Sequence, residues 1–239
     1  MPRAAFLSLA AAIALFCLPA HASDSQWHIS AGPALLIVPK YPGAAGQDVL
    51  PIVDVDIAYG RLFLNSRHGA GTYLLDTETQ QAGVSLWFRR GRNRHDSDQV
   101  AHLEAIDDAP AAHAFFSQRF GSMALGASVT QALAKGGGVM ADGSVAWQLQ
   151  LSNATRMQAG IRAVIGDPRY MRTWFDSDAG LASVGGFASV MHQLSPNWTV
   201  VAFAGCDVLV GDAADGPAVE RETMPMFAVS VLRRFGGRR

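Results

Sequence analysis

Cysteine, lysine and long apolar segments are all scarce in this chain. It contains 2 cysteines, and 2 of its 19 basic residues are lysine. Because Cys17 falls in an N-terminal segment that we expect to be removed, Cys206 has no partner for an intramolecular disulfide. The net charge of −1 gives no reason to expect nucleic-acid binding. Beyond that segment, no stretch is apolar for long enough to form a transmembrane helix.

The first 22 residues have the pattern of a secretory signal peptide. Arg3 provides the positive end, an apolar run covers residues 4–18, and Ala20-His21-Ala22 forms an A-x-A cleavage site. The apolar run is short for a membrane-spanning helix. We therefore expect residues 1–22 to be a signal peptide and residues 23–239 to form one domain.

What the chain does contain is a regular alternation of apolar and polar residues. It is 49% hydrophobic and holds 24 glycines, which is a high content for a soluble secreted domain. Segments with a side-chain period of two indicate β-strands. They cover residues 26–38, 51–59, 61–66, 71–76, 81–89, 111–120, 122–133, 139–151, 155–165, 181–194, 198–210 and 224–235. The count is about 12, or about 10 if the two weak segments 61–66 and 71–76 are loop.

Short and long connections alternate between these segments. The long ones are residues 90–110, 134–138, 166–180 and 211–223. All long loops then lie at one end, which is typical of outer-membrane barrels with short periplasmic turns and longer external loops. A closed barrel also pairs every backbone polar group in lipid. We therefore predict an all-β fold: a single antiparallel transmembrane β-barrel in a bacterial outer membrane.

The last predicted strand has two unlike faces. One face is mostly apolar and is expected to meet lipid; it carries Phe227, Val229, Val231 and Phe235. A strand of this kind near the end of a secreted chain resembles the closing strand of bacterial outer-membrane barrels, which usually finish on Phe or Trp. Here four residues, GGRR, follow the last Phe.

The strand predicted over residues 51–59 places its valines on one face and two carboxylates, Asp54 and Asp56, on the other. Paired carboxylates can do acid–base work, but this needs a bound substrate and separated pKa values. We instead predict that both line the lumen. Arginines such as Arg156 and Arg162 would balance their charge, because an unpaired buried carboxylate is costly.

Four arginines cluster where a predicted strand ends at the long-loop side: Arg89, Arg90, Arg92 and Arg94. Guanidinium forks suit phosphate groups, and the outer leaflet of this membrane presents phosphorylated glycolipid. The four residues are therefore candidates for glycolipid contact. The alternative is that they snorkel to the membrane interface without a specific ligand.

The loop that follows holds several groups able to bind metal: His95, Asp96, Asp98, His102 and Glu104. Their spacing matches no standard ligand pattern such as H-E-x-x-H. We predict a solvated loop, no metal site and no cofactor.

No Ser/His/Asp set stands in a recognisable context, and the GxSxG elbow is absent. Some outer-membrane barrels are enzymes with serine and histidine at the lipid edge. An enzymatic role of Ser85, Ser128 or His192 is therefore an open alternative. We predict no catalytic residues and a protein that is not an enzyme.

Three segments resemble the MltA-interacting protein (MipA/OmpV) family. Residues 211–219 (GDAADGPAV) resemble its GDAADSP segment before the final strand; the motif residues are Gly211, Asp212, Ala213, Ala214, Asp215, Gly216 and Pro217. Residues 170–175 (YMRTWF) resemble a loop two strands earlier. Residues 41–43 (YPG), followed by Leu50-Pro51, resemble the first loop and the start of the second strand. Gly216 stands where the family often has Ser, and Trp174 replaces a usual Tyr.

The resemblance implies an outer-membrane barrel in contact with lipid. Family members resemble scaffolds that hold a lytic murein transglycosylase near a murein synthase, and others are described as porin-like or adhesive. We therefore expect docking of periplasmic murein-modifying proteins on the short turns and residues 23–26. One alternative is a narrow porin-like channel whose modest lumen Trp147 or arginines fill. Another is a soluble β-barrel or sandwich carrier.

Overall fold

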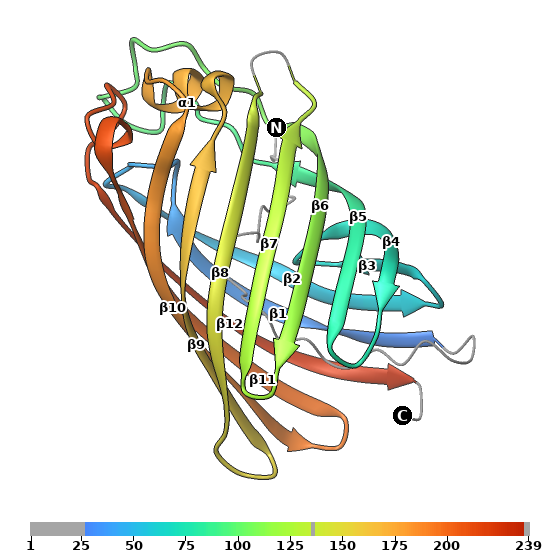
Figure 1. The fold of residues 1–239 in the computed structure, drawn as a ribbon. Helices are drawn as coiled ribbons and strands as arrows, with labels where there is room; N and C mark the ends of the chain where they lie inside the picture. Colours follow the sequence, from blue (N-terminus) through green and yellow to red (C-terminus); the bar gives the residue numbers. More distant parts are fainter. Residues whose placement is uncertain (1–26, 135–136, 237–239) are drawn as a thin grey trace.

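A computed structural model of the chain describes residues 27–134 and 137–236 (Figure 1). The expected signal peptide and residues 23–26 lie outside the described residues. Twelve strands form one closed antiparallel barrel, in which sequence neighbours pair and β1 closes onto β12. The predicted fold is confirmed. No helix in these ranges is long and apolar enough to cross a membrane.

The elements follow the predicted order. They are β1 (Trp27–Pro39), β2 (Gln47–Tyr59), β3 (Leu62–Asn65), β4 (Gly69–Asp76), β5 (Gln80–Arg89), β6 (Ala109–Phe120), β7 (Met123–Ala132), β8 (Val139–Gln150), β9 (Thr155–Gly166), α1 (Pro168–Phe175), β10 (Gly180–Ser195), β11 (Trp198–Leu209), η1 (Gly211–Ala213) and β12 (Thr223–Gly236). The two weak segments are true strands, so the count is 12 rather than 10. The helix α1 lies inside residues 166–180, for which the residue pattern predicts a loop.

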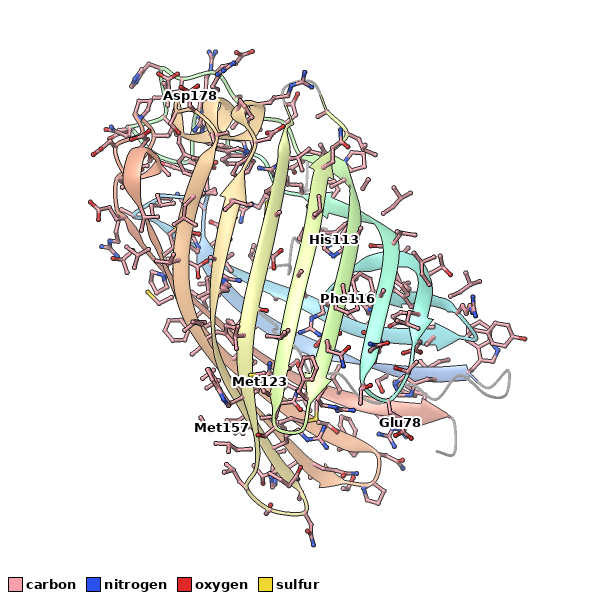
Figure 2. The ribbon with its side chains drawn as sticks, viewed as in Figure 1. Glu78, His113, Phe116, Met123, Met157 and Asp178 are labelled. Atoms are coloured by element: carbon pink, nitrogen blue, oxygen red, sulfur yellow. The ribbon has the colours of Figure 1, made fainter. Side chains whose placement is uncertain are left out.

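The two ends of the barrel differ as predicted. The long connections 90–108, 167–179 and 210–222 share the end that carries α1, and short turns such as 121–122 and 196–197 share the other. In Figure 1, α1 and the long loops lie at the top, with the hairpin tips below. In Figure 2, Asp178 lies at the α1 end, whereas Glu78 lies toward the short turns.

The outward strand faces are apolar, as lipid contact requires. Val53 on β2 is 67% exposed, while its neighbour Asp54 is 9% exposed and points inward. The same alternation corrects one expectation about the lumen. On β8, Ala146 is fully buried, so the period of two turns Trp147 outward, where it is 50% exposed. Trp147 therefore does not fill the lumen.

Aromatic side chains gather on the outer face toward the short turns. Trp27 stacks on Tyr59 with ring centroids 4.7 Å apart. Phe120, Trp198 and Phe235 are exposed on the same end of their strands. Aromatic girdles of this kind mark the membrane–water interfaces of outer-membrane barrels. We therefore place the periplasmic membrane boundary at this belt.

Strand β3 is short, so it leaves part of β2 without a partner on that side. It pairs only with the end of β2 from Asp56 to Tyr59. Ser66 extends the pairing by one residue, because its hydroxyl accepts from the Val55 amide at 2.9 Å. Pro51 lies beyond this point, where no described strand pairs with that edge. A proline has no N–H to leave unpaired, which suits an edge position.

Candidate functional site in the plugged lumen

The external end of the barrel is closed by packed loops. Twelve buried side chains form one apolar cluster, which we call the plug: Tyr41, Ala44, Val100, Tyr170, Met171, Trp174, Phe175, Ala182, Leu209, Ala213, Ala218 and Met224. They come from α1, from the three connections 40–46, 90–108 and 210–222, and from the adjoining strand ends. Met171 and Phe175 are each 1% exposed. The plug therefore buries the apolar face of α1 as firmly as a protein core.

Local sequence signals explain α1. The Asp167 carboxylate accepts a hydrogen bond from the Tyr170 amide at 2.7 Å, and Pro168 follows at the first helical position. Burial alone would raise the pKa of Asp167, but hydrogen bonds from backbone amides hold it below its ordinary value. Asp176 ends the helix in the left-handed region, with φ of 55°. The Asp-Pro pair was the signal that would have predicted this helix.

The GDAADGP motif forms part of the plug. Gly211 takes a left-handed φ of 56°, and Ala213 is fully buried in the apolar cluster. At Gly216 a Cβ atom would lie 2.8 Å from the Phe175 carbonyl oxygen, so the missing side chain allows close packing on the end of α1. The remaining polar members, Asp212 and Asp215, are exposed. The motif therefore serves the packing of the plug in this chain.

A second apolar cluster fills the middle of the barrel. This lumen core consists of Leu36, Ala146, Phe187, Phe203 and Met226, and partly buried residues from β1, β2 and β12 pack against it. The Phe187 and Phe203 rings are stacked with centroids 6.4 Å apart. Gly160 makes room for them, because a Cβ there would lie 2.7 Å from the Phe187 ring.

A cavity of about 250 Å³ lies between the plug and the lumen core. Its walls combine apolar side chains with inward polar groups from β7, β8, β9 and β11. Arg162 and Asp207 form an ion pair there, with Nε to Oδ1 at 2.8 Å. The Ser128 hydroxyl donates to the Asp142 carboxylate. The volume lies below the roughly 300–1,000 Å³ of drug-sized pockets.

His113 borders this cavity and contacts a second histidine, His68. His113, labelled in Figure 2, lies with Nδ1 2.9 Å from the Thr130 hydroxyl and Nε2 3.0 Å from His68 Nδ1. The His68 ring stacks on Phe115 with centroids 3.8 Å apart. Residue spacing does not reveal this pair, because 45 residues separate the two histidines and only the pairing of β4, β5 and β6 brings them together.

The predicted lumen-lining residues do not form one site. Asp56 meets His28, with Oδ2 and Nε2 3.4 Å apart. Arg156 donates to Gln150 at 3.2 Å. Arg162 pairs with Asp207 instead of balancing Asp54 or Asp56. The remaining carboxylate, Asp54, is buried on β2.

The arginine cluster divides in the structure. Arg94 is exposed. The Arg90 guanidinium pairs with Asp48. Arg89 and Arg92 turn inward and lie over the Trp174 ring, with Cζ 5.0 Å and 5.9 Å from its centroid. Contact of all four with glycolipid stays a prediction.

Beside these arginines lies a groove of about 650 Å³ between α1 and the 90–108 loop, which we call the external groove. Arg89, Arg90 and Trp174 line both this groove and the lumen cavity. The two spaces therefore share a wall made of cationic and aromatic groups.

The other polar candidates lie apart. Within residues 27–134 and 137–236, no three His, Cys, Asp or Glu side chains are placed to hold a metal ion. In the loop with His95, Asp98, His102 and Glu104, the Asp96 carboxylate accepts from the Asn93 amide at 2.6 Å. Ser85 is buried on β5, Ser128 bonds Asp142, and His192 on β10 bonds Thr155. On the closing strand, Phe227, Val229 and Phe235 are exposed and Val231 is partly exposed.

Hydrogen bonds tie three external connections together. The Tyr41 hydroxyl donates to the Glu220 carboxylate and lies 2.9 Å from the Ser97 hydroxyl. Burial and the bond to Glu220 raise the pKa of Tyr41 to about 12. Burial alone would raise the pKa of Glu220, but bonds from Ser97 and Tyr41 and the charge of Lys40 hold it below its ordinary value.

A closed barrel with an apolar outer face, an aromatic belt and long loops at one end defines an outer-membrane β-barrel protein. The sequence pattern of a family described as MltA-interacting protein MipA matches residues 31–235. The chain belongs to this family, as the resemblance of its three segments predicted. No curated protein matches the sequence.

Several solved structures are similar in shape. Neisserial surface protein A is 7% identical, with 87% of this chain and 97% of that chain covered and a TM-score of 0.32. OmpT of Vibrio cholerae is 9% identical, with 89% and 99% covered and a TM-score of 0.39. The NanC porin is 5% identical, with 88% and 100% covered and a TM-score of 0.42.

Proposed function

We propose that this barrel docks periplasmic murein-modifying proteins at the outer membrane, without catalysing a reaction or conducting solutes. The family description names interaction with MltA. The observation that carries the proposal is the filled lumen: the plug and the lumen core occupy successive levels of the barrel with buried apolar side chains. A conducting barrel needs a polar, water-filled interior.

The docking surface would lie on the hairpins β8–β9 and β10–β11. Their tips reach the lowest point of the view in Figure 1, beyond the β6–β7 turn. Leu149, Leu151 and Leu194 near these tips are 52%, 58% and 60% exposed. Exposed apolar groups at the periplasmic end can form a protein contact. A stable interface buries about 800 Å² per partner, so neighbouring turns and residues 23–26 would contribute.

Affinity capture from cross-linked envelopes tests this proposal. The tagged barrel is the bait, and an unrelated barrel is the negative control. We expect recovery of a murein hydrolase or synthase. The double variant Leu151→Asp/Leu194→Asp should lose that partner. Leu133→Asp should keep it, because Leu133 is equally exposed (54%) but lies at the opposite end.

Heat-dependent gel mobility must show that each variant still forms a barrel. Recovery of only the general assembly machinery by the wild type would contradict docking. Equal recovery of the partner by both variants would show that the docking surface does not lie on these tips.

A narrow channel is the second candidate function, favoured by the wall that the lumen cavity and the external groove share. Single-channel recording in planar bilayers separates the two candidates. The filled lumen predicts no conductance for the wild type. Steady conductance would overturn the non-conducting proposal.

A further inference from the structure

The external groove is rich in guanidinium groups. Four arginines line it: Arg89, Arg90, Arg92 and Arg172. Two of them have acidic partners, since Arg90 pairs with Asp48 and Arg172 lies 3.4 Å from Asp178. The other two, Arg89 and Arg92, form no ion pair with any residue that the structure describes.

These two arginines contact only backbone oxygens and rings. Arg89 Nη1 donates to the Gly137 carbonyl at 3.1 Å, and Arg92 Nη1 donates to the Trp174 carbonyl at 3.4 Å. Arg92 is 95% buried, being 5% exposed, and its Nε atom has no hydrogen-bond partner within the described chain. Burial lowers the pKa of Arg92, because the charged form loses part of its hydration. A buried charge without a counter-ion is costly.

An anion in the groove would remove this cost. Guanidinium forks bind phosphate or carboxylate through paired N–H groups, and Arg89 and Arg92 lie over one indole ring that limits their movement. The external end of an outer-membrane barrel lies at a surface that presents phosphorylated glycolipid. The location therefore favours phosphate over carboxylate.

The groove is not uniformly basic, and its acidic residues limit the class of ligand that it can bind. Glu104, Asp107 and Asp176 also line it. These carboxylates would repel a bare polyanion, but they accept hydrogen bonds from hydroxyl or ammonium groups. Trp174 supplies an apolar ring in the same lining. Hydroxyl groups, a phosphate and an apolar face occur together in sugar phosphates.

We propose that the external groove binds a phosphorylated sugar, with Arg89 and Arg92 holding the phosphate and the acidic residues accepting from the sugar. The sugar phosphate is either a lipid headgroup of the outer leaflet or a soluble molecule. This site is independent of the periplasmic docking surface, because it lies at the opposite end of the barrel.

Calorimetry on the full-length, detergent-solubilised protein tests the site. The probes are glucosamine 1-phosphate, inorganic phosphate, and nanodiscs with or without a phosphorylated glycolipid. We expect the sugar phosphate to bind more tightly than inorganic phosphate. Arg89→Gln and Arg92→Gln should each weaken binding by about tenfold or more, as loss of a hydrogen bond to a charged group implies.

Arg94→Gln is the matched control. Arg94 lies in the same loop as Arg92, but it is exposed and outside the groove lining. Its loss should leave the dissociation constant unchanged. Equal weakening by all three variants, or no binding of any probe, would overturn the proposal. Binding only to glycolipid nanodiscs would identify a lipid headgroup as the ligand. Binding to both glucosamine 1-phosphate and glycolipid nanodiscs would show that the groove recognises the phosphorylated sugar itself.

A measurement on the wild type covers the case in which the glutamine variants fail to fold. Phenylglyoxal modifies accessible arginines, and mass spectrometry of peptides reports each site. The sugar phosphate should protect the partly exposed Arg89 from modification while the exposed Arg94 reacts at its usual rate. Unchanged labelling of Arg89 at saturating probe would also overturn the proposal.

Discussion

Arg162 on β9 and Asp207 on β11 meet across β10, directly over Gly185. The register pairs Gly185 with both residues. A Cβ atom at Gly185 would overlap Asp207 Oδ1, so the absent side chain leaves the space in which the pair forms. The two side chains are 10% and 8% exposed. Three neighbouring strands therefore cooperate to build one buried ion pair.

Arg162→Met should destabilise the barrel, because it leaves the Asp207 carboxylate buried and unpaired. The expected loss in free energy of unfolding is about 3–5 kcal/mol. The double variant Arg162→Met/Asp207→Leu should recover most of it, since no charge is left behind. Urea unfolding in lipid vesicles, followed by tryptophan fluorescence, measures both. Equal stability of the single and double variants would contradict the pair's role.

Gly185→Ala should disturb the same pair by filling its space. The new methyl group must displace the Asp207 carboxylate, so the variant should be less stable than the wild type. Combining it with Arg162→Met should cost less than the sum of the two losses, because both act on one interaction. Gly143→Ala is a suitable control, because a Cβ there would meet no atom within 4 Å. Strictly additive stability losses would show that Gly185→Ala does not act through the Arg162–Asp207 pair.

Val53→Arg should impair assembly, because Val53 is exposed to lipid at the middle of β2. Arginine at the bilayer midplane costs about 2–4 kcal/mol. Gln47→Arg, at the end of the same strand, should cost at most about 1 kcal/mol, because charges near the interface are tolerated. Folded yield in vesicles, read from heat-dependent gel mobility, compares the two. A normal yield for Val53→Arg would mean that the outer face of β2 does not meet lipid.

The contact between Tyr41 and Glu220 predicts a loss of loop packing at both extremes of pH. The pKa of Glu220 is lowered in the folded state, so its contribution is present above the ordinary glutamate pKa and is lost as pH falls through the lowered value. The pKa of Tyr41 is raised to about 12, so its contribution is complete below pH of about 10 and is lost as pH rises toward 12.

Limited proteolysis of the external loops across pH measures this effect. Cleavage should increase in acid and again in strong alkali. Glu220→Gln should abolish the acid-induced increase, because the amide does not titrate. An acid response identical to that of the wild type would assign the effect to other groups.

The barrel was predictable because its physics is local. Membrane strands expose alternate residues to lipid and lumen, so the period of two in segments such as 51–59 and 224–235 was enough to indicate the strands and their faces. The alternation of short and long connections indicated which end is which. Even α1 had a local signal in Asp167-Pro168, although the aromatic residues that follow were interpreted as loop.

The interior was decided only by tertiary structure. A sequence pattern shows that Asp54 and Arg162 point inward, but not which inward residues meet. Strand register places Arg162 beside Asp207 across β10 and brings His68 to His113 across β5. The packing of loops on α1 likewise turns Arg89 and Arg92 onto Trp174 and leaves Arg94 outside. Partners of buried groups depend on long-range geometry, which residue spacing along the chain does not encode.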